Sequence, residues 1–119
     1  MTEKEKEMLD QVEELMKVLG RKWKPAIMFC LVFSGPKRFT ELKKLIPDIT
    51  QKMLTQRLRE LERDGLVKRT FYEEIPPRVE YEITELGSSV DPIFNALCAW
   101  GKEHSKEVSQ ANTQYDQSH

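Results

Sequence analysis

The stretch Ile49–Thr70, ITQKMLTQRLRELERDGLVKRT, decides the fold, because its first half follows a helical period and its second half does not. At about 100° per residue, Leu54, Leu58 and Leu61 fall within roughly 40° of one another and form an apolar stripe. We therefore expect a helix whose leucine side packs on a core. The opposite side, spread over roughly 100°, carries Lys52, Thr55, Gln56, Arg59 and Arg63.

The polar side of this helix contains the side chains that reach phosphates and base edges in DNA. The ordinary alternative is a solvated helix surface. The polar side has no carboxylate, although Glu60, Glu62 and Asp64 lie elsewhere on the same helix. On this feature alone both interpretations stay open, so the flanking sequence has to decide between them.

A shorter helix is predicted just before the quoted one. RFTELKKLIPD has Thr40 as its expected N-cap and ends at Pro47. Its inward face is expected to hold Phe39, Leu42, Leu45 and Ile46. After a brief turn, Thr50 is a good N-cap for the quoted helix, and Gly65 is expected to follow its end. Two helices joined by so short a turn, the second with a basic outer face, predict a helix-turn-helix.

The hydrophobic period changes to two after Gly65. LVKRTFYEE and RVEYEIT read as two strands, and Val79, Tyr81 and Ile83 alternate with glutamates in the second. Pro76 and Pro77 lie between the strands and cannot donate to a ladder, so they mark the hairpin tip. A β-hairpin directly after a helix-turn-helix predicts the wing of a winged helix.

Two terminal helices complete the prediction. An amphipathic helix with apolar residues from Met8 to Leu19 should end at Gly20, and a last helix should follow Gly87 with Ile93 and Leu97 on one face. Between the first helix and the helix-turn-helix, KWKPAIMFCLVFSGP predicts a helix that is apolar almost all round and central in the core.

The predicted fold class is mainly α with a small β-hairpin (α+β), a winged helix-turn-helix with N- and C-terminal dimerisation helices. Residues 1–104 would form this domain. Residues 105–119 form a polar tail that we expect to be disordered.

The distribution of charge along the chain narrows the possible functions. The chain of 119 residues suits one domain, and its formal net charge is only −1. Residues 20–71, however, hold 13 basic and 5 acidic residues, a net +8 between two acidic ends. A local positive surface of this kind is what a polyanion recognises.

Other function classes find little support in the sequence. The two cysteines, Cys30 and Cys98, are far apart, no Cys/His cluster exists, and no catalytic set or cofactor loop is evident. We therefore expect no enzyme, metal or cofactor. The start lacks the apolar segment of a signal peptide, and the longest apolar run, Ala26–Phe33, is too short to span a bilayer. These features predict a soluble, cytoplasmic protein with reduced thiols.

The segments GRKWKPAIM, SGPKRFTELKKLIPDITQKMLTQRLRELERDGLVKR and PPRVEYEITELG resemble the HxlR-type branch of the MarR-like winged-helix transcriptional regulators. The resemblance covers roughly Leu19 to Gly101. It implies a dimeric DNA-binding regulator with the quoted helix in the major groove, the hairpin along the minor groove, and an interface built from the terminal helices. One departure concerns a Cys-Pro pair that many members carry as an oxidant sensor, because the matching positions here are Asp10 and Gln11.

The leading hypothesis is a sequence-specific regulator that binds double-stranded DNA as a homodimer on a pseudo-palindromic operator. A small-molecule effector is a further candidate partner. The alternative is a winged-helix module used only for protein–protein contact. The candidate DNA contacts are Lys37, Arg38, Thr50, Gln51, Lys52, Thr55, Gln56, Arg59 and Arg78. Arg57 and Arg63 could equally be solvated or salt-bridged. The candidate dimer interface is Met8, Val12, Leu15, Leu19, Ile93, Leu97 and Trp100.

Overall fold

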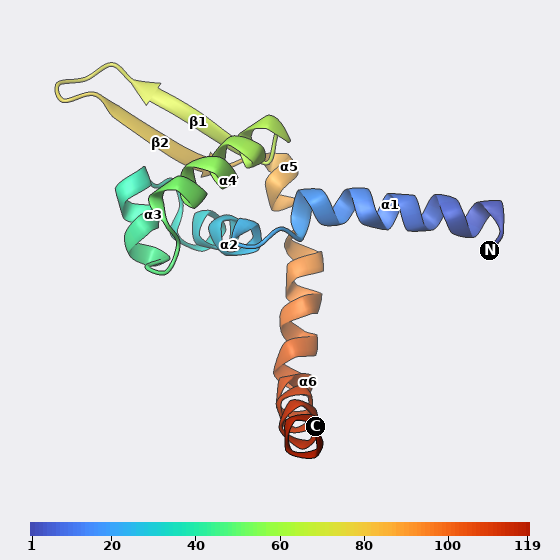
Figure 1. The fold of residues 1–119 in the computed structure, drawn as a ribbon. Coiled ribbons are helices and arrows are strands. Elements are labelled where there is room, and N and C mark those ends of the chain that lie inside the picture. The colour runs from blue at the N-terminus through green and yellow to red at the C-terminus, as the bar shows by residue number, and fades with distance from the viewer. The chain divides into compact units, whose positions relative to one another are not determined.

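The computed structural model describes the whole chain, Met1–His119, as two compact units, Met1–Ser88 and Ser89–His119. It is mostly helical with a single two-stranded antiparallel sheet, which confirms the predicted fold class (Figure 1). None of the helices combines the length and the apolar character that a membrane span requires. The elements are α1 (Glu3–Leu19), α2 (Lys24–Ser34), α3 (Phe39–Leu45), α4 (Gln51–Arg63), β1 (Val67–Tyr72), β2 (Arg78–Ile83), α5 (Glu85–Ser88) and α6 (Asp91–Ser118).

The helix α4 forms as its sequence predicts. The hydroxyl of Thr50 accepts a hydrogen bond from the backbone N–H of Met53 at 3.1 Å, which satisfies one of the free donors at the helix start. Leu54, Leu58 and Leu61 are buried. The helix ends before Gly65, whose φ of 77° is a left-handed conformation that suits glycine.

The helix α3 begins differently from the prediction. Arg38, and not Thr40, is its N-cap, and the carboxylate of Glu41 reaches back to accept from the Arg38 backbone N–H at 2.9 Å. The bond satisfies the N–H of the N-cap residue itself, whereas a Thr40 cap would have accepted from N–H groups two or three residues further along the helix. Leu42 and Ile46 are buried as predicted and Phe39 is half-buried, whereas Leu45 is 48% exposed.

Only one face of the helix α2 is buried in the core. Ile27, Met28 and Leu31 are buried, whereas Phe29 and Phe33 are 50% and 71% exposed and their rings lie 4.4 Å apart. The prediction of a helix central in the core therefore holds for one face of α2 and not for this aromatic pair. The sequence shows that a residue is apolar but not which face of α2 its neighbours cover.

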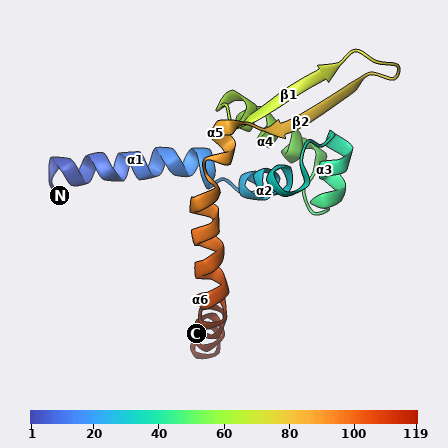
Figure 2. The same ribbon diagram turned by 180° about the vertical axis from the view of Figure 1, so that it is seen from behind.

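The β-hairpin is attached to the helices at several places, because β2 contacts α2, α3 and α5 and β1 contacts α4. Its strands pair from Val67 with Ile83 to Tyr72 with Arg78, and the predicted prolines lie in the connecting loop. Lys37 and Tyr81 exchange two backbone hydrogen bonds, of 2.9 and 2.8 Å, so the segment before α3 is bound to β2. On the other strand, β1 contacts α4, and Figures 1 and 2 show the hairpin lying beside that helix.

The end of the chain also differs from the prediction. α6 continues to Ser118, so residues 105–118 are helical and not a disordered tail. A helix that is already nucleated gains one hydrogen bond for each residue it adds, and no proline or glycine follows Gly101 to interrupt it. No residue of α6 is buried.

A buried charge joins α1, α2 and α4. Lys24, at the start of α2, is 2% exposed, and its Nζ lies 3.1 Å from Glu60 Oε2 and 3.9 Å from Asp64 Oδ2. The same ammonium donates to the carbonyl oxygen of Lys17 at 3.0 Å. All its near partners are therefore acceptors, which is the condition under which a buried charge is tolerated.

Glu60 is the shared acceptor of this cluster. Arg57 lies 2.6 Å and Arg21 3.6 Å from Glu60 Oε1, and Arg57 also donates to the carbonyl oxygen of Lys22 at 2.9 Å. Burial pushes the pKa of Glu60 upward, but the hydrogen bond and charge of Lys24, with the charges of Arg57 and Arg21, hold that pKa below its usual value. We call these residues, Arg21, Lys24, Arg57, Glu60 and Asp64, the Lys24 cluster.

We predict that Glu60→Gln lowers the free energy of unfolding by about 3 kcal/mol at neutral pH, because it removes the main partner of a buried ammonium. The folded state keeps Glu60 ionised at lower pH than the unfolded chain does. Its contribution is therefore complete above about pH 5 and is lost as the pH falls through the lowered pKa. Urea unfolding at pH 7 and pH 3.5 measures both effects.

The matched control is Glu14→Gln, which removes an exposed ion pair with Lys17 at 3.0 Å. Such pairs contribute about 0.5 kcal/mol or less. Equal stabilities of the two variants at pH 7 would show that the Lys24 cluster does not hold the helices together.

Candidate nucleic-acid interface

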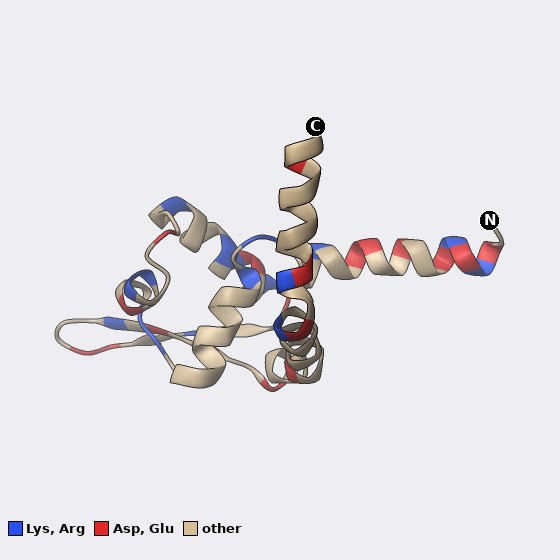
Figure 3. Ribbon diagram, turned by 90° about the horizontal axis from the view of Figure 1, so that it is seen from below, with Lys and Arg blue, Asp and Glu red and all other residues tan.

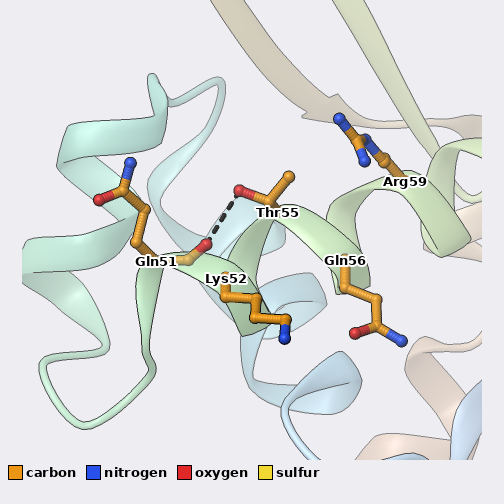
Figure 4. Close-up of a pocket in the computed structure, with 5 residues that line it drawn as sticks. All are labelled: Gln51, Lys52, Thr55, Gln56 and Arg59. Atoms are coloured by element: carbon orange, nitrogen blue, oxygen red, sulfur yellow. Dashed lines mark hydrogen bonds between the residues drawn. The ribbon is translucent and has the colours of Figure 1, made fainter.

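The outer side of α4 forms a shallow groove. All five of its lining residues were predicted as DNA contacts, and Figure 4 shows them: Gln51, Lys52, Thr55, Gln56 and Arg59. Thr55 is partly engaged already, because its hydroxyl donates to the carbonyl oxygen of Gln51 at 2.9 Å. The other four side chains belong to exposed residues.

The residues of this groove point in two directions. Lys52 and Gln56 project away from the hairpin, whereas the Arg59 side chain is directed toward the strands (Figure 4). The glutamine amide carries both donors and an acceptor, so it can bind the edge of adenine with two hydrogen bonds. Lysine and arginine donate only, and they suit guanine edges and phosphates.

Three further predicted contacts lie beside α4 and do not line its groove. Lys37 is held by its backbone against β2, and Arg38 is exposed at the start of α3. The Thr50 hydroxyl is occupied by the cap of α4. Its hydroxyl proton remains a donor, so capping does not exclude a phosphate contact.

Arg78 does not lie free at the wing. Its guanidinium lies 3.4 Å from carboxylate oxygens of both Glu74 and Glu80, and 4.1 Å from the centre of the Tyr72 ring. Its side chain is 26% exposed. A DNA phosphate would have to compete with two carboxylates for this charge, which weakens the case for Arg78 as a strong contact.

Arg57 has a structural role, where the sequence had left a DNA contact and a solvated or salt-bridged position equally open. Its side chain is 12% exposed and is bound within the Lys24 cluster. Arg69, by contrast, was not predicted as a contact. It lines a second groove, between α4 and β1, with Arg59. Side chains alternate between the two faces of a strand, so Arg69 lies on the same face as buried Val67. This alternation could have identified Arg69 as a residue that faces the helices.

The outer groove of α4 has no carboxylate among its lining residues, although Glu60 and Glu62 lie elsewhere on that helix. Glutamates recur along α1 (Figure 3), and Glu73 and Glu74 occupy the loop between the strands. No group of three or more acidic, histidine or cysteine side chains could hold a metal ion. The electrostatics therefore favour α4 and the adjacent base of the hairpin as the surface that faces a polyanion.

The fold and the α4 surface define a class, that of winged helix-turn-helix proteins. The profile of the HxlR-like helix-turn-helix family matches residues 18–109, and the chain belongs to that family. It is therefore a DNA-binding transcriptional regulator, as the resemblance implied.

Individual relatives agree with this assignment. The HTH-type transcriptional regulator YtcD of Bacillus subtilis is 52% identical over 97 residues, which cover 82% of this chain and 76% of that protein. The crystal structure of YtcD superposes with a TM-score of 0.77 over 80% of this chain and 96% of that chain. The redox regulator HypR in its reduced form is 41% identical, with a TM-score of 0.77 over 84% of this chain and 98% of that chain.

The thiols of this chain are placed unlike a sensor pair. Cys30 lies in α2, where burial raises the pKa of its thiol, and the thiolate is the reactive form. Cys98 is exposed on α6. Asp10, which the sequence resemblance aligned with a sensing cysteine, lies in α1.

We predict that peroxide or a quinone changes DNA affinity less than about twofold, since a raised pKa leaves little thiolate at Cys30. Operator binding before and after oxidant measures this, with Cys98→Ser as the control. A large loss of binding that disappears in Cys98→Ser would make Cys98 a sensor and contradict the prediction.

Proposed function

We propose that the protein binds a pseudo-palindromic operator as a homodimer, with α4 of each subunit in the major groove and the hairpin along the minor groove. The observation that carries the proposal is the exposed, carboxylate-free groove of Gln51, Lys52, Thr55, Gln56 and Arg59. Their helix is fixed to the core by three buried leucines and by the Lys24 cluster. A rigid element can present side chains to bases in one register.

Each predicted contact has a proposed role. Lys52, Thr55, Gln56 and Arg59 reach base edges, with Gln51 near the helix start. Lys37, Arg38 and Thr50 contact phosphates, because they lie at the starts of α3 and α4 where helix dipoles also favour anions. Arg78 flanks the minor groove and contributes little, since Glu74 and Glu80 already neutralise it.

The proposed dimer rests on apolar side chains that remain exposed in one chain. Met8, Val12 and Leu15 of α1 are 57%, 52% and 54% exposed. Ile93, Leu97 and Trp100 of α6 are 50%, 62% and 58% exposed, and Leu19 is half-buried. Contiguous apolar faces of this kind mark surfaces that a partner covers. Occupancy of the operator would then depend on protein level or on a non-covalent small-molecule effector.

Selection of duplexes from a random pool by the purified protein tests the proposal as a whole. It predicts an enriched motif with two inverted half-sites about one helical turn, or a small multiple, apart. The rival module for protein–protein contact predicts no enrichment and no retention on heparin at moderate salt.

We predict that Gln56→Ala weakens binding to the best operator by about 1–3 kcal/mol and relaxes the preference at one base pair of each half-site. Gln56 lies opposite the leucine stripe, so the fold should be unchanged. Titration of operator duplexes with single base changes measures this, and the exposed α6 residue Gln110 provides a control, Gln110→Ala. Identical profiles for all three proteins would contradict a base contact at Gln56.

We predict that Leu15→Glu and Leu97→Glu each shift the protein to monomers, because a buried unpaired carboxylate disfavours an apolar interface. The monomers should bind a half-site weakly and the full operator without cooperativity. Sedimentation velocity measures the mass, and Val108→Glu, farther along α6, is the comparison. Variants that remain dimeric would place the interface elsewhere.

A further inference from the structure

The second groove lies between α4 and β1 and holds two arginines. It is lined by Thr55, Leu58, Arg59, Glu62, Arg69 and Tyr81. Arg59 enters it from the helix, with its side chain directed toward the strands (Figure 4). Arg69 enters it from β1, where it pairs across the ladder with Tyr81.

Both arginines are held by rigid elements. Arg69 is two residues from Val67, which is 2% exposed, so the alternation of the strand turns both side chains toward the helices. Tyr81, opposite Arg69, is bound through its backbone to Lys37 on its other side. Arg59 follows Leu58, which is also buried, on the well-capped helix α4.

The charges of these two arginines are not neutralised within the chain. Arg57 and Arg78 form ion pairs at 2.6 and 3.4 Å, whereas neither Arg59 nor Arg69 forms one. Glu62 lines the same groove without pairing with either. Two like charges that face one groove repel, and an anion between them would be bound by both. Guanidinium groups suit phosphate oxygens because their N–H donors match the oxygen geometry.

We propose that this Arg59–Arg69 groove binds one backbone phosphodiester of the DNA in each subunit, which makes Arg69 a DNA-contact residue. The inference rests on the proposed function and refines it. Arg59 has five N–H donors, enough to contact the phosphate and a neighbouring base edge together. The DNA backbone is then held at the base of the hairpin, and the acidic loop with Glu73 and Glu74 extends beyond it.

The test uses the full-length protein and the duplex that the wild-type protein selects. Arg69→Ala should lower affinity about tenfold for all sequences alike and reduce the slope of log K against log salt by about 0.9, the value for one phosphate. Arg69→Lys should restore most of the slope. Lys68→Ala is the matched control. It removes the same charge from the residue of β1 that precedes Arg69, and the Lys68 side chain lies on the other face of the hairpin.

Two further measurements probe for a phosphate in the groove. Glu62→Gln should tighten binding, because it removes a negative charge beside the phosphate without touching either arginine. Duplexes with a single neutral methylphosphonate should lose affinity for the wild-type protein at one position in each half-site, and Arg69→Ala should lose no further affinity at that position.

The outcomes separate the two levels of the argument. Failure of the wild-type protein to select any duplex would overturn the proposed function. Specific binding in which Arg69→Ala behaves like Lys68→Ala, with methylphosphonate effects that persist in Arg69→Ala, would overturn this inference alone.

Discussion

The buried ammonium of Lys24 is the constraint on which the rest of the DNA-binding unit depends. It lies at the start of α2, and its partners come from α1 and from the second half of α4, through the Lys17 carbonyl, Glu60 and Asp64. Desolvation of an ammonium is so unfavourable that an arrangement lacking these acceptors would be strongly disfavoured. The hydrophobic stripe of α4 seats that helix on the core, but an apolar contact alone tolerates sliding and rotation. The directional ion pairs to Lys24 and the hydrogen bond from Arg57 to the Lys22 carbonyl oxygen set its position along its axis.

Fixing one side of α4 determines what the other side can do. The polar residues diverge into two sets, one that points away from the hairpin and one that faces β1 (Figure 4). The first set has the donor and acceptor pattern that distinguishes bases, and the second concentrates positive charge next to a strand. The pairing of Lys37 with Tyr81 connects β2 to the start of α3, so the two helices of the motif and the hairpin base form one frame. A regulator that reads bases from one helix needs such a frame, because a shift of about 1 Å breaks a bidentate hydrogen bond.

The sequence was sufficient for the elements whose signals are local. The leucine spacing of α4, the Thr50 cap and the two prolines of the wing each specify structure within a few residues. Some of the features that it did not resolve depend on partners far along the chain. Arg57, for which the sequence left a DNA contact and a salt bridge equally open, donates to the carbonyl oxygen of Lys22, and Arg69 matters only because β1 lies beside α4. Arg78 is neutralised closer by, by Glu74 of the adjoining loop and Glu80 of its own strand. The exposed Phe29 shows the same limit, since periodicity does not reveal which apolar face is left uncovered.

The central claim is that the Lys24 cluster holds α4 so that its outer side enters the major groove. Methylation interference on the selected operator tests this most directly, because dimethyl sulfate modifies guanine N7 in the major groove and adenine N3 in the minor groove. The account predicts that N7 methylation blocks binding at symmetric positions in both half-sites, while N3 methylation interferes only where the hairpin approaches the flanking sequence. Interference at N3 positions alone, with no effect of N7 methylation, would contradict it.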